Sequence, residues 1–243
     1  MVNHESALIP GWYGKIPSLG DFTSRRLPTS FINSWDVWLQ HAMAASREQL
    51  GERWLDVYLT GPIWRFTLMP QVCDDNMWAG ILMPSVDNVG RYFPLTFTIK
   101  IEPNPRMMSA IFSAQNWYAD LEQVALNSLN IHALPDDIDQ CLTLHPFPAA
   151  YLKEKSIPVQ ELATWWQKES LAATNVHNML SLPSAGLLSQ LFDTTAKDLL
   201  FSSGLGKSIW WKVSSEDAAT QLHCFAGLPP DTYFASLLQN VAQ

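Results

Sequence analysis

Two glycine- and proline-containing segments hold most of the side chains in the first half of the chain that could do chemistry. They are residues 14–26 and 83–94, and each places aspartate and arginine beside apolar, strand-like sequence. Such residues can hold loops together as ion pairs, and arginine also recognises carboxylates through planar, multi-donor hydrogen bonds. Spacing alone leaves both interpretations open, a structural ion-pair network and a recognition surface. The candidate partner-binding residues are Lys15, Asp21, Phe22, Arg25, Arg26, Asp87 and Arg91.

The two loops are expected at the ends of short apolar strands, where they form one patch if those ends are neighbours. Arg25 and Arg26 precede a helix, where positive charge is unfavourable to the helix dipole. We therefore expect this pair to serve binding rather than stability. Arg91 lies next to a buried strand and is expected to serve the structure.

Other residues that could do chemistry are better explained structurally. Residues 203–208 end in Gly-Lys-Ser, but a phosphate loop needs glycine at position 201, where Phe201 stands, and must open a helix. We expect a hairpin turn there. Asp136, Asp137 and Asp139 suit the positive N-terminus of a helix. The six histidines lack the spacing of a metal site, and no G-x-S-x-G motif is present. We therefore expect no catalytic residue, no metal and no cofactor.

Composition narrows the class of protein. The 243 residues are 47% hydrophobic and 16% charged, and they include 11 tryptophans. Such a chain has either a large core or apolar surface kept for a partner. The net charge of −8 argues against a nucleic-acid-binding surface. The N-terminus lacks the basic and apolar regions of a signal peptide, and no run of about 18 apolar residues is present. We expect a cytoplasmic protein without membrane insertion.

The periodicity of apolar residues predicts the elements of the first half. Trp35 and Trp38 lie on one face of a helix over residues 31–50, which we expect to pack on a sheet together with Trp64. Alternating and continuous apolar segments predict an antiparallel meander within residues 62–101, with its third strand beginning beyond Pro94 or lying at an edge. The expected elements are a strand at 11–16, helices at 31–50 and 52–59, and strands at 63–68, 78–83 and 92–99.

The second half is expected to mix helices and strands. The pattern predicts helices over 107–129, from 135, over 159–172 and from 229, and strands over 208–213 and 221–225. Trp210 and Trp211 are adjacent on one strand and must point to opposite faces. If helices cover both faces of the sheet, both are core residues, and this is the interpretation we favour. If one face is open, one of the two is a candidate anchor for a partner. The fold class is α/β, with a mixed, largely antiparallel sheet in a single domain over residues 1–243.

An ordered series of motifs resembles the TagF (ImpM) family. It begins with Gly11-Trp-Tyr-Gly-Lys-Ile-Pro-Ser-Leu-Gly-Asp-Phe22 and continues through Trp78-Ala-Gly-x-Leu-Met-Pro-Ser-Val-Asp87 to Gly90-Arg-Tyr-Phe-Pro-Leu95. The intervening motifs are Ser24-Arg-Arg-Leu-Pro28, Trp35-Asp-x-Trp-Leu39, Trp54-Leu55 and Pro62-x-Trp-Arg-Phe66. The resemblance is dense over residues 11–101, thins from 102 onwards, and returns weakly near 209–211 and 227–229.

The resemblance implies an accessory protein of the bacterial type VI secretion system with a three-layer αβα sandwich fold. It further implies a post-translational repressor that acts beside a threonine kinase/phosphatase pathway by binding the forkhead-associated scaffold protein, Fha. Two alternatives stay open from the residues. One is a positive assembly factor of the same system. The other is a hydrolase that uses Asp21 or Asp87 with an arginine, which requires a deep pocket around residues of perturbed pKa.

Overall fold

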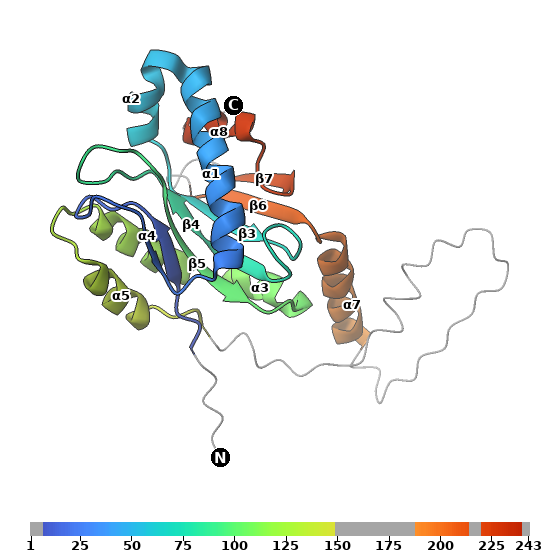
Figure 1. Cartoon of the computed structure of the whole chain (residues 1–243). Helices are drawn as coiled ribbons and strands as arrows, with labels where there is room; N and C mark the ends of the chain where they lie inside the picture. The colour runs from blue at the N-terminus through green and yellow to red at the C-terminus, as the bar shows by residue number, and fades with distance from the viewer. Residues whose placement is uncertain (1–6, 149–187, 214–219, 240–243) are drawn as a thin grey trace.

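A seven-stranded sheet organises the protein, as the computed structural model in Figure 1 shows for residues 7–148, 188–213 and 220–239. The strands are β1 (Gly11–Gly14), β2 (Thr23–Arg25), β3 (Trp64–Leu68), β4 (Met77–Met83), β5 (Leu95–Ile101), β6 (Lys207–Lys212) and β7 (Gln221–Ala226). The longer helices are α1 (Thr29–Leu50), α3 (Pro105–Ser113), α4 (Gln115–Ser128), α5 (Pro135–Leu144) and α7 (Leu188–Ser203). Shorter helices are η1 (Gly51–Arg53), α2 (Trp54–Leu59), η4 (Asp231–Tyr233) and α8 (Phe234–Leu238).

The strand order is β2-β1-β5-β4-β3-β6-β7, and every ladder between these strands is antiparallel. The predicted α/β class is confirmed. The sheet was expected to be mixed and largely antiparallel, and within the described residues it is antiparallel throughout. The meander of β3, β4 and β5 is also confirmed, and β5 begins directly after Pro94, as expected of a residue that cannot donate to a ladder. At its centre Gly80 lies so close to β5 that a Cβ would stand 2.0 Å from the carbonyl oxygen of Phe97, so only glycine fits.

One face of the sheet is covered by α1, α2 and α8 (Figure 1). The expected face of α1 is confirmed, since Trp35 and Trp38 are buried in this layer together with Trp64. Each buried indole N–H finds an acceptor 2.8 Å away, which a buried tryptophan requires. The acceptors are Thr96 Oγ1 for Trp35, the carbonyl of Pro229 for Trp38 and the carbonyl of Leu237 for Trp64.

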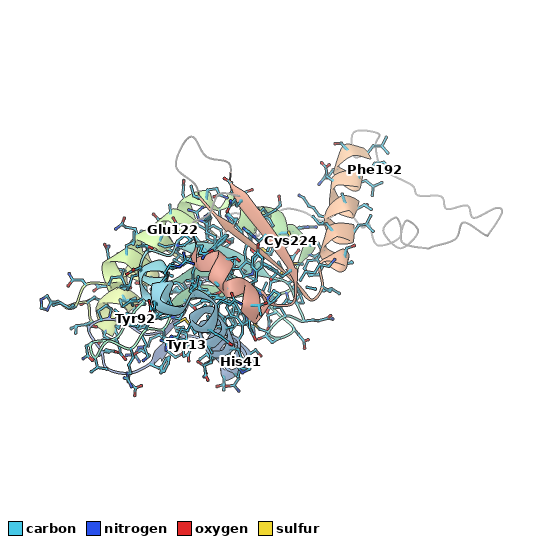
Figure 2. All side chains as sticks on the ribbon, turned by 90° about the horizontal axis from the view of Figure 1, so that it is seen from above. Tyr13, His41, Tyr92, Glu122, Phe192 and Cys224 are labelled. Atoms are coloured by element: carbon cyan, nitrogen blue, oxygen red, sulfur yellow. The ribbon has the colours of Figure 1, made fainter. Side chains whose placement is uncertain are left out.

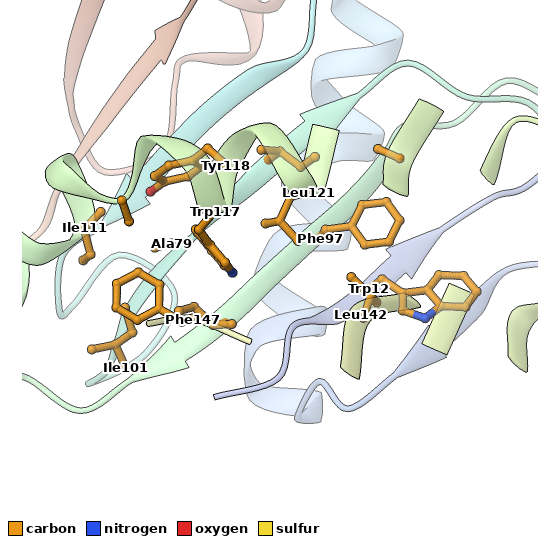
Figure 3. Close-up of a cluster of buried hydrophobic side chains, with 14 of the residues drawn as sticks. Trp12, Ala79, Phe97, Ile101, Ile111, Trp117, Tyr118, Leu121, Leu142 and Phe147 are labelled. Carbon is orange, nitrogen blue, oxygen red and sulfur yellow. The ribbon is translucent and has the colours of Figure 1, made fainter. Parts of the chain in front are cut away.

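The opposite face is covered by α3, α4 and α5, which completes three layers (Figure 1). Figure 3 shows Trp117, Tyr118 and Leu121 of α4 lying over the sheet in the same cluster as Trp12 and Phe97. The single helix expected over residues 107–129 is wrong, because α3 ends at Ser113 and α4 begins at Gln115. Ala114 between them has φ −79° and ψ 45°, which is outside the helical region and turns the chain.

Trp210 and Trp211 are both buried, on opposite faces of β6, so the core interpretation is confirmed. The hairpin turn expected at residues 203–208 is wrong. Helix α7 ends at Ser203 and β6 begins at Lys207, so this loop joins a helix to a strand and does not open a helix as a phosphate loop would. The predicted helix over 159–172 lies outside the described residues. Within the described ranges, no helix has the length and apolarity needed to cross a bilayer.

Candidate interaction site

The two loops singled out in the sequence lie side by side at one end of β1. The backbone N–H of Asn88 donates to the carbonyl of Leu19 at 3.0 Å. The Ser85 hydroxyl donates to the carbonyl of Lys15 at 2.7 Å, and an Arg91 Nη2–H donates to the carbonyl of Gly20. These bonds tie residues 15–22 to residues 85–93, and we call the combined surface the Phe22 platform. It lies on the side of the molecule away from α7, where Figure 2 shows Tyr13 and Tyr92.

Asp87 is the centre of the platform, and its carboxylate is completely buried. Oδ2 accepts from Lys15 Nζ at 2.9 Å and from Arg91 Nε at 2.7 Å. Oδ1 accepts from the backbone N–H groups of Val89 at 3.1 Å and Arg91 at 2.8 Å. Burial by itself raises the pKa of this carboxyl, but the hydrogen bonds from Lys15, Arg91 and Val89 outweigh it and hold the pKa well below its usual range. Asp87 is therefore an ionised carboxylate with donors on both oxygens, and it fixes the loop around it.

Lys15 connects Asp87 to the exposed part of the platform. The residue is only 4% exposed, and its Nζ lies 4.8 Å from the centre of the Phe22 ring. Gly14 makes this position possible, because it has φ +140° and a Cβ there would stand 2.3 Å from the carbonyl oxygen of Pro94. Because the Lys15 ammonium is buried with Asp87 as its carboxylate partner, loss of Asp87 would leave a buried charge without a counter-ion.

Phe22 is the apolar side chain that the platform presents to solvent. It is 44% exposed, although its ring stacks on Tyr13 at 5.9 Å and meets the Phe93 ring edge-on at 4.8 Å. Asp21 accepts the backbone N–H of Phe22 at 2.8 Å and is itself exposed. Within the described residues Asp21 forms no ion pair with this cluster. The ring is thus held in one orientation while nearly half of its surface faces solvent.

Arg25 and Arg26 belong to a different group, so the expectation of one patch is corrected. Arg26 Nη2 lies 2.8 Å from Asp139 Oδ1, and its Nε donates to the carbonyl of Pro10 at 2.9 Å. Arg25 lies 3.6 Å from Asp139 and 3.8 Å from Asp136. The cause is the register of β2, since Arg25 pairs with Trp12 while Thr23 pairs with Gly14. Antiparallel pairing carries the arginines back toward the start of β1 and over α5, roughly 10 Å along the strand from Lys15.

This pairing also corrects the earlier explanation of the arginines and of the aspartates on α5. Asp136 and Asp137 lie in the first turn of α5, and Asp137 accepts the backbone N–H of Leu134 at 3.2 Å, as a helix N-terminus requires. Asp139 instead accepts the indole N–H of Trp12 at 2.8 Å and pairs with both arginines. The positive charge before α1 is therefore balanced by α5 and needs no function outside the fold to explain it.

Sequence reasoning missed a hollow that borders the platform. It has a volume of about 610 Å³ and is lined by Arg47, Gly51, Trp54, Leu55, Gly90, Arg91 and Tyr92. Five of these residues lie in two motifs that the sequence did single out, Trp54-Leu55 and Gly90-Arg-Tyr92. Nothing in the sequence connects Arg47 to them, because the turn through η1 brings them together. Among the described residues, no three His, Cys, Asp or Glu side chains converge in a way that could hold a metal ion.

Comparisons with known proteins agree on one family. The family model described as TagF N-terminal domain, type VI secretion system-associated, matches residues 11–144. Among solved structures, the chain is similar to PA0076 from Pseudomonas aeruginosa PAO1, with 29% sequence identity, a TM-score of 0.70 and coverage of 96% of each chain. No curated protein matches the chain.

Proposed function

The chain belongs to the TagF N-terminal domain family of type VI secretion-associated proteins, and on that premise we propose that it is a post-translational repressor of such a system. In this proposal it acts in the cytoplasm without an enzymatic activity, a metal or a cofactor. It binds the forkhead-associated scaffold protein, Fha, through the Phe22 platform. The binding would link it to the kinase/phosphatase pathway of the system.

The observation that carries the proposal is the state of Phe22. Aromatic side chains dominate the binding energy of protein interfaces, and most of that energy comes from a few well-positioned residues. Phe22 is aromatic, 44% exposed, and already ordered by Tyr13, Phe93 and Lys15 before any partner arrives. Little side-chain entropy then remains to be lost on binding, which favours affinity.

The properties of Asp87 favour a binding role over a catalytic role for the Phe22 platform. A general base needs a free lone pair within reach of a substrate proton and a pKa near the working pH. Both oxygens of Asp87 already accept two hydrogen bonds each, and its pKa is lowered. These properties suit a residue that shapes a loop.

The proposal is tested with Phe22→Ala and a matched control, Leu126→Ala. Leu126 of α4 is 50% exposed but lies on the opposite layer, so both variants remove a similar amount of exposed apolar side chain. We expect purified Phe22→Ala to lose capture of the forkhead-associated protein, and Leu126→Ala to retain it. Equal capture by the two variants would remove Phe22 from the interface.

The direction of regulation is tested in cells of a strain that carries the system. Deletion of the gene should raise secretion of the tube protein, and overproduction of the wild type should lower it. Overproduced Phe22→Ala should fail to lower secretion, while Leu126→Ala should act like the wild type. Loss of secretion on deletion would instead identify a positive assembly factor.

A further inference from the structure

The hollow beside the Phe22 platform combines two arginines with an apolar wall. Arg47 comes from the last turn of α1, and Arg91 comes from the loop before β5. Trp54 and Leu55 of α2 form the wall between them, and the ring of Tyr92 meets Trp54 edge-on at 5.7 Å. We call this site the Arg47–Arg91 hollow.

Arg47 is positioned by its stacking on Trp54. Its guanidinium carbon lies 4.3 Å from the centre of the Trp54 ring, and the residue is exposed. Within residues 7–148, 188–213 and 220–239, no carboxylate lies within ion-pair distance of Arg47. A guanidinium that stacks through its face keeps the N–H groups of its edge for another acceptor.

Two hydrogen bonds position the Arg91 side chain, and they leave some of its N–H groups for a ligand. Its Nε donates to Asp87 and its Nη2 donates to the carbonyl of Gly20, whereas no bond within the described part of the chain involves Nη1. Its side chain remains 56% exposed. Asp87 faces two cations, Lys15 and Arg91, so it neutralises only one of their two positive charges. The hollow is therefore a positive site on a protein whose net charge is −8.

The donors of the hollow fit a carboxylate better than a phosphate. Phosphate sites in proteins typically present several backbone N–H groups to the ligand. Here the backbone N–H of Gly51 donates to the carbonyl of Arg47, and those of Gly90 and Arg91 donate to Asp87. These amides are already used, which leaves the two guanidinium edges, and arginine edges match a carboxylate in geometry and charge.

We propose that the Arg47–Arg91 hollow binds an acidic peptide segment of a protein partner. A glutamate or aspartate of that segment lies between the two guanidinium groups, and a neighbouring apolar side chain packs on Trp54 and Leu55. The volume of about 610 Å³ accommodates more than one side chain. The inference rests on the proposed function only in taking the ligand to be a protein, and it assigns that partner a chemistry.

The test measures the affinity of three labelled synthetic peptides for the purified full chain by fluorescence anisotropy. The first peptide carries Leu-Phe flanked by two glutamates on each side. The second has glutamine in place of every glutamate, and the third has phosphoserine in place of every glutamate. We expect the glutamate peptide to bind at least about tenfold more tightly than the glutamine peptide, and its affinity to fall as salt rises.

The matched variants are Arg47→Glu and Arg53→Glu. Both residues are exposed arginines, with Arg47 in the last turn of α1 and Arg53 at the end of η1, but of the two only Arg47 lines the hollow. Arg47→Glu should lower the affinity for the glutamate peptide by at least about tenfold, and Arg53→Glu should change that affinity by less than about twofold. Thermal unfolding of both variants checks that they are folded.

Three results would overturn the proposal: no binding of the glutamate peptide, equal binding of the glutamate and glutamine peptides, or equal effects of the two variants. Tighter binding of the phosphoserine peptide by about tenfold would replace the carboxylate with a phosphoryl group as the ligand. The outcome is separable from that of the proposed function. If repression is lost in Phe22→Ala but kept in Arg47→Glu, the partner binds through the Phe22 platform and the Arg47–Arg91 hollow has no part in repression.

Discussion

Asp87 and Asp139 are each a carboxylate facing two cations, yet their surroundings differ in burial. Asp87 has a fully buried side chain and a partner, Lys15, that is also buried. Asp139 is 22% exposed, and its partners Arg25 and Arg26 are 46% and 32% exposed. In the sequence the segments that carry Arg25–Arg26 and Arg91 look alike, since both adjoin apolar strands. The comparison teaches that an Asp–Arg pair does not by itself show how much an aspartate contributes to stability. The contribution depends on whether the aspartate and its cationic partners are buried, as Asp87 and Lys15 are.

The largest effect is expected from Asp87→Asn. The substitution removes the negative charge that Lys15 and Arg91 share and leaves the Lys15 ammonium buried without a counter-ion. Breaking a buried ion pair in this way costs about 3–5 kcal/mol of unfolding free energy. Urea unfolding followed by circular dichroism measures the loss.

The matched control for that change is Asp139→Asn. The amide oxygen of asparagine can still accept the indole N–H of Trp12, and the ion pairs that are weakened are partly exposed to solvent. We expect a loss of about 1 kcal/mol or less. Similar losses in the two variants would contradict the contrast between the two aspartates.

Acid pH provides a second test of the role of Asp87. The pKa of Asp87 is lower in the folded protein than in the unfolded chain, so the unfolded chain binds more protons as pH falls. The stabilisation from Asp87 is therefore fully present above about pH 4, the usual value for an aspartate, and is lost as pH falls further through the folded pKa. The difference in unfolding free energy between wild type and Asp87→Asn should stay constant from about pH 7 to pH 5 and shrink below about pH 4. A difference that grows toward acid pH would contradict this assignment.

Arg91→Ala is expected to have an intermediate effect. Asp87 keeps Lys15 and two backbone donors, but the loop loses the two side-chain bonds that join Asp87 to Gly20. Because the Arg91 side chain is 56% exposed, we expect a loss of about 1–2 kcal/mol. Arg91→Lys keeps the charge but cannot make both bonds, so in thermal unfolding it should lie between wild type and alanine. An unchanged melting temperature in Arg91→Ala would show that the loop is held by other contacts.

The smallest effect is expected from Arg25→Ala. Its distances of 3.6 and 3.8 Å to Asp139 and Asp136 are long, and its side chain is 46% exposed. Exposed pairs of this kind contribute about 0–1 kcal/mol. Arg26→Ala should cost more, because Arg26 also donates to the carbonyl of Pro10. The order of the two variants in urea unfolding, with Arg26→Ala the less stable, checks the assignment; the reverse order would contradict it.

The sequence predicted those parts of the fold that depend on local periodicity. The face of α1 with Trp35 and Trp38, the meander of β3 to β5 and the opposite faces of Trp210 and Trp211 all follow from spacings of 3.6 or 2 residues. The break at Ala114 was not predictable, because apolar residues continue on both sides of it and tertiary packing decides where the helix turns.

The sequence predicted which residues are candidates for the site, but not that they fall into two separate groups. The two loops and most of their residues were identified from the types of side chain they carry. The separation of Arg25 and Arg26 from Asp87 depends on the three-residue ladder between β1 and β2 and on α5, more than 100 residues further along the chain. Arg47 and Trp54 meet only because α1 ends at Leu50 and the chain turns through η1. Contacts of this kind come from the assembled fold, which residue spacing does not contain.

The central claim is that the Phe22 platform, and not the Arg25–Arg26 pair, contacts the partner. Isothermal titration of purified Phe22→Ala and Arg25→Ala with the forkhead-associated protein of the same strain tests it most directly. We predict that Phe22→Ala weakens binding by at least about tenfold, since loss of an aromatic interface anchor costs about 2 kcal/mol or more. Arg25→Ala should change the affinity by less than about twofold. Wild-type affinity in Phe22→Ala together with a tenfold loss in Arg25→Ala would contradict the account.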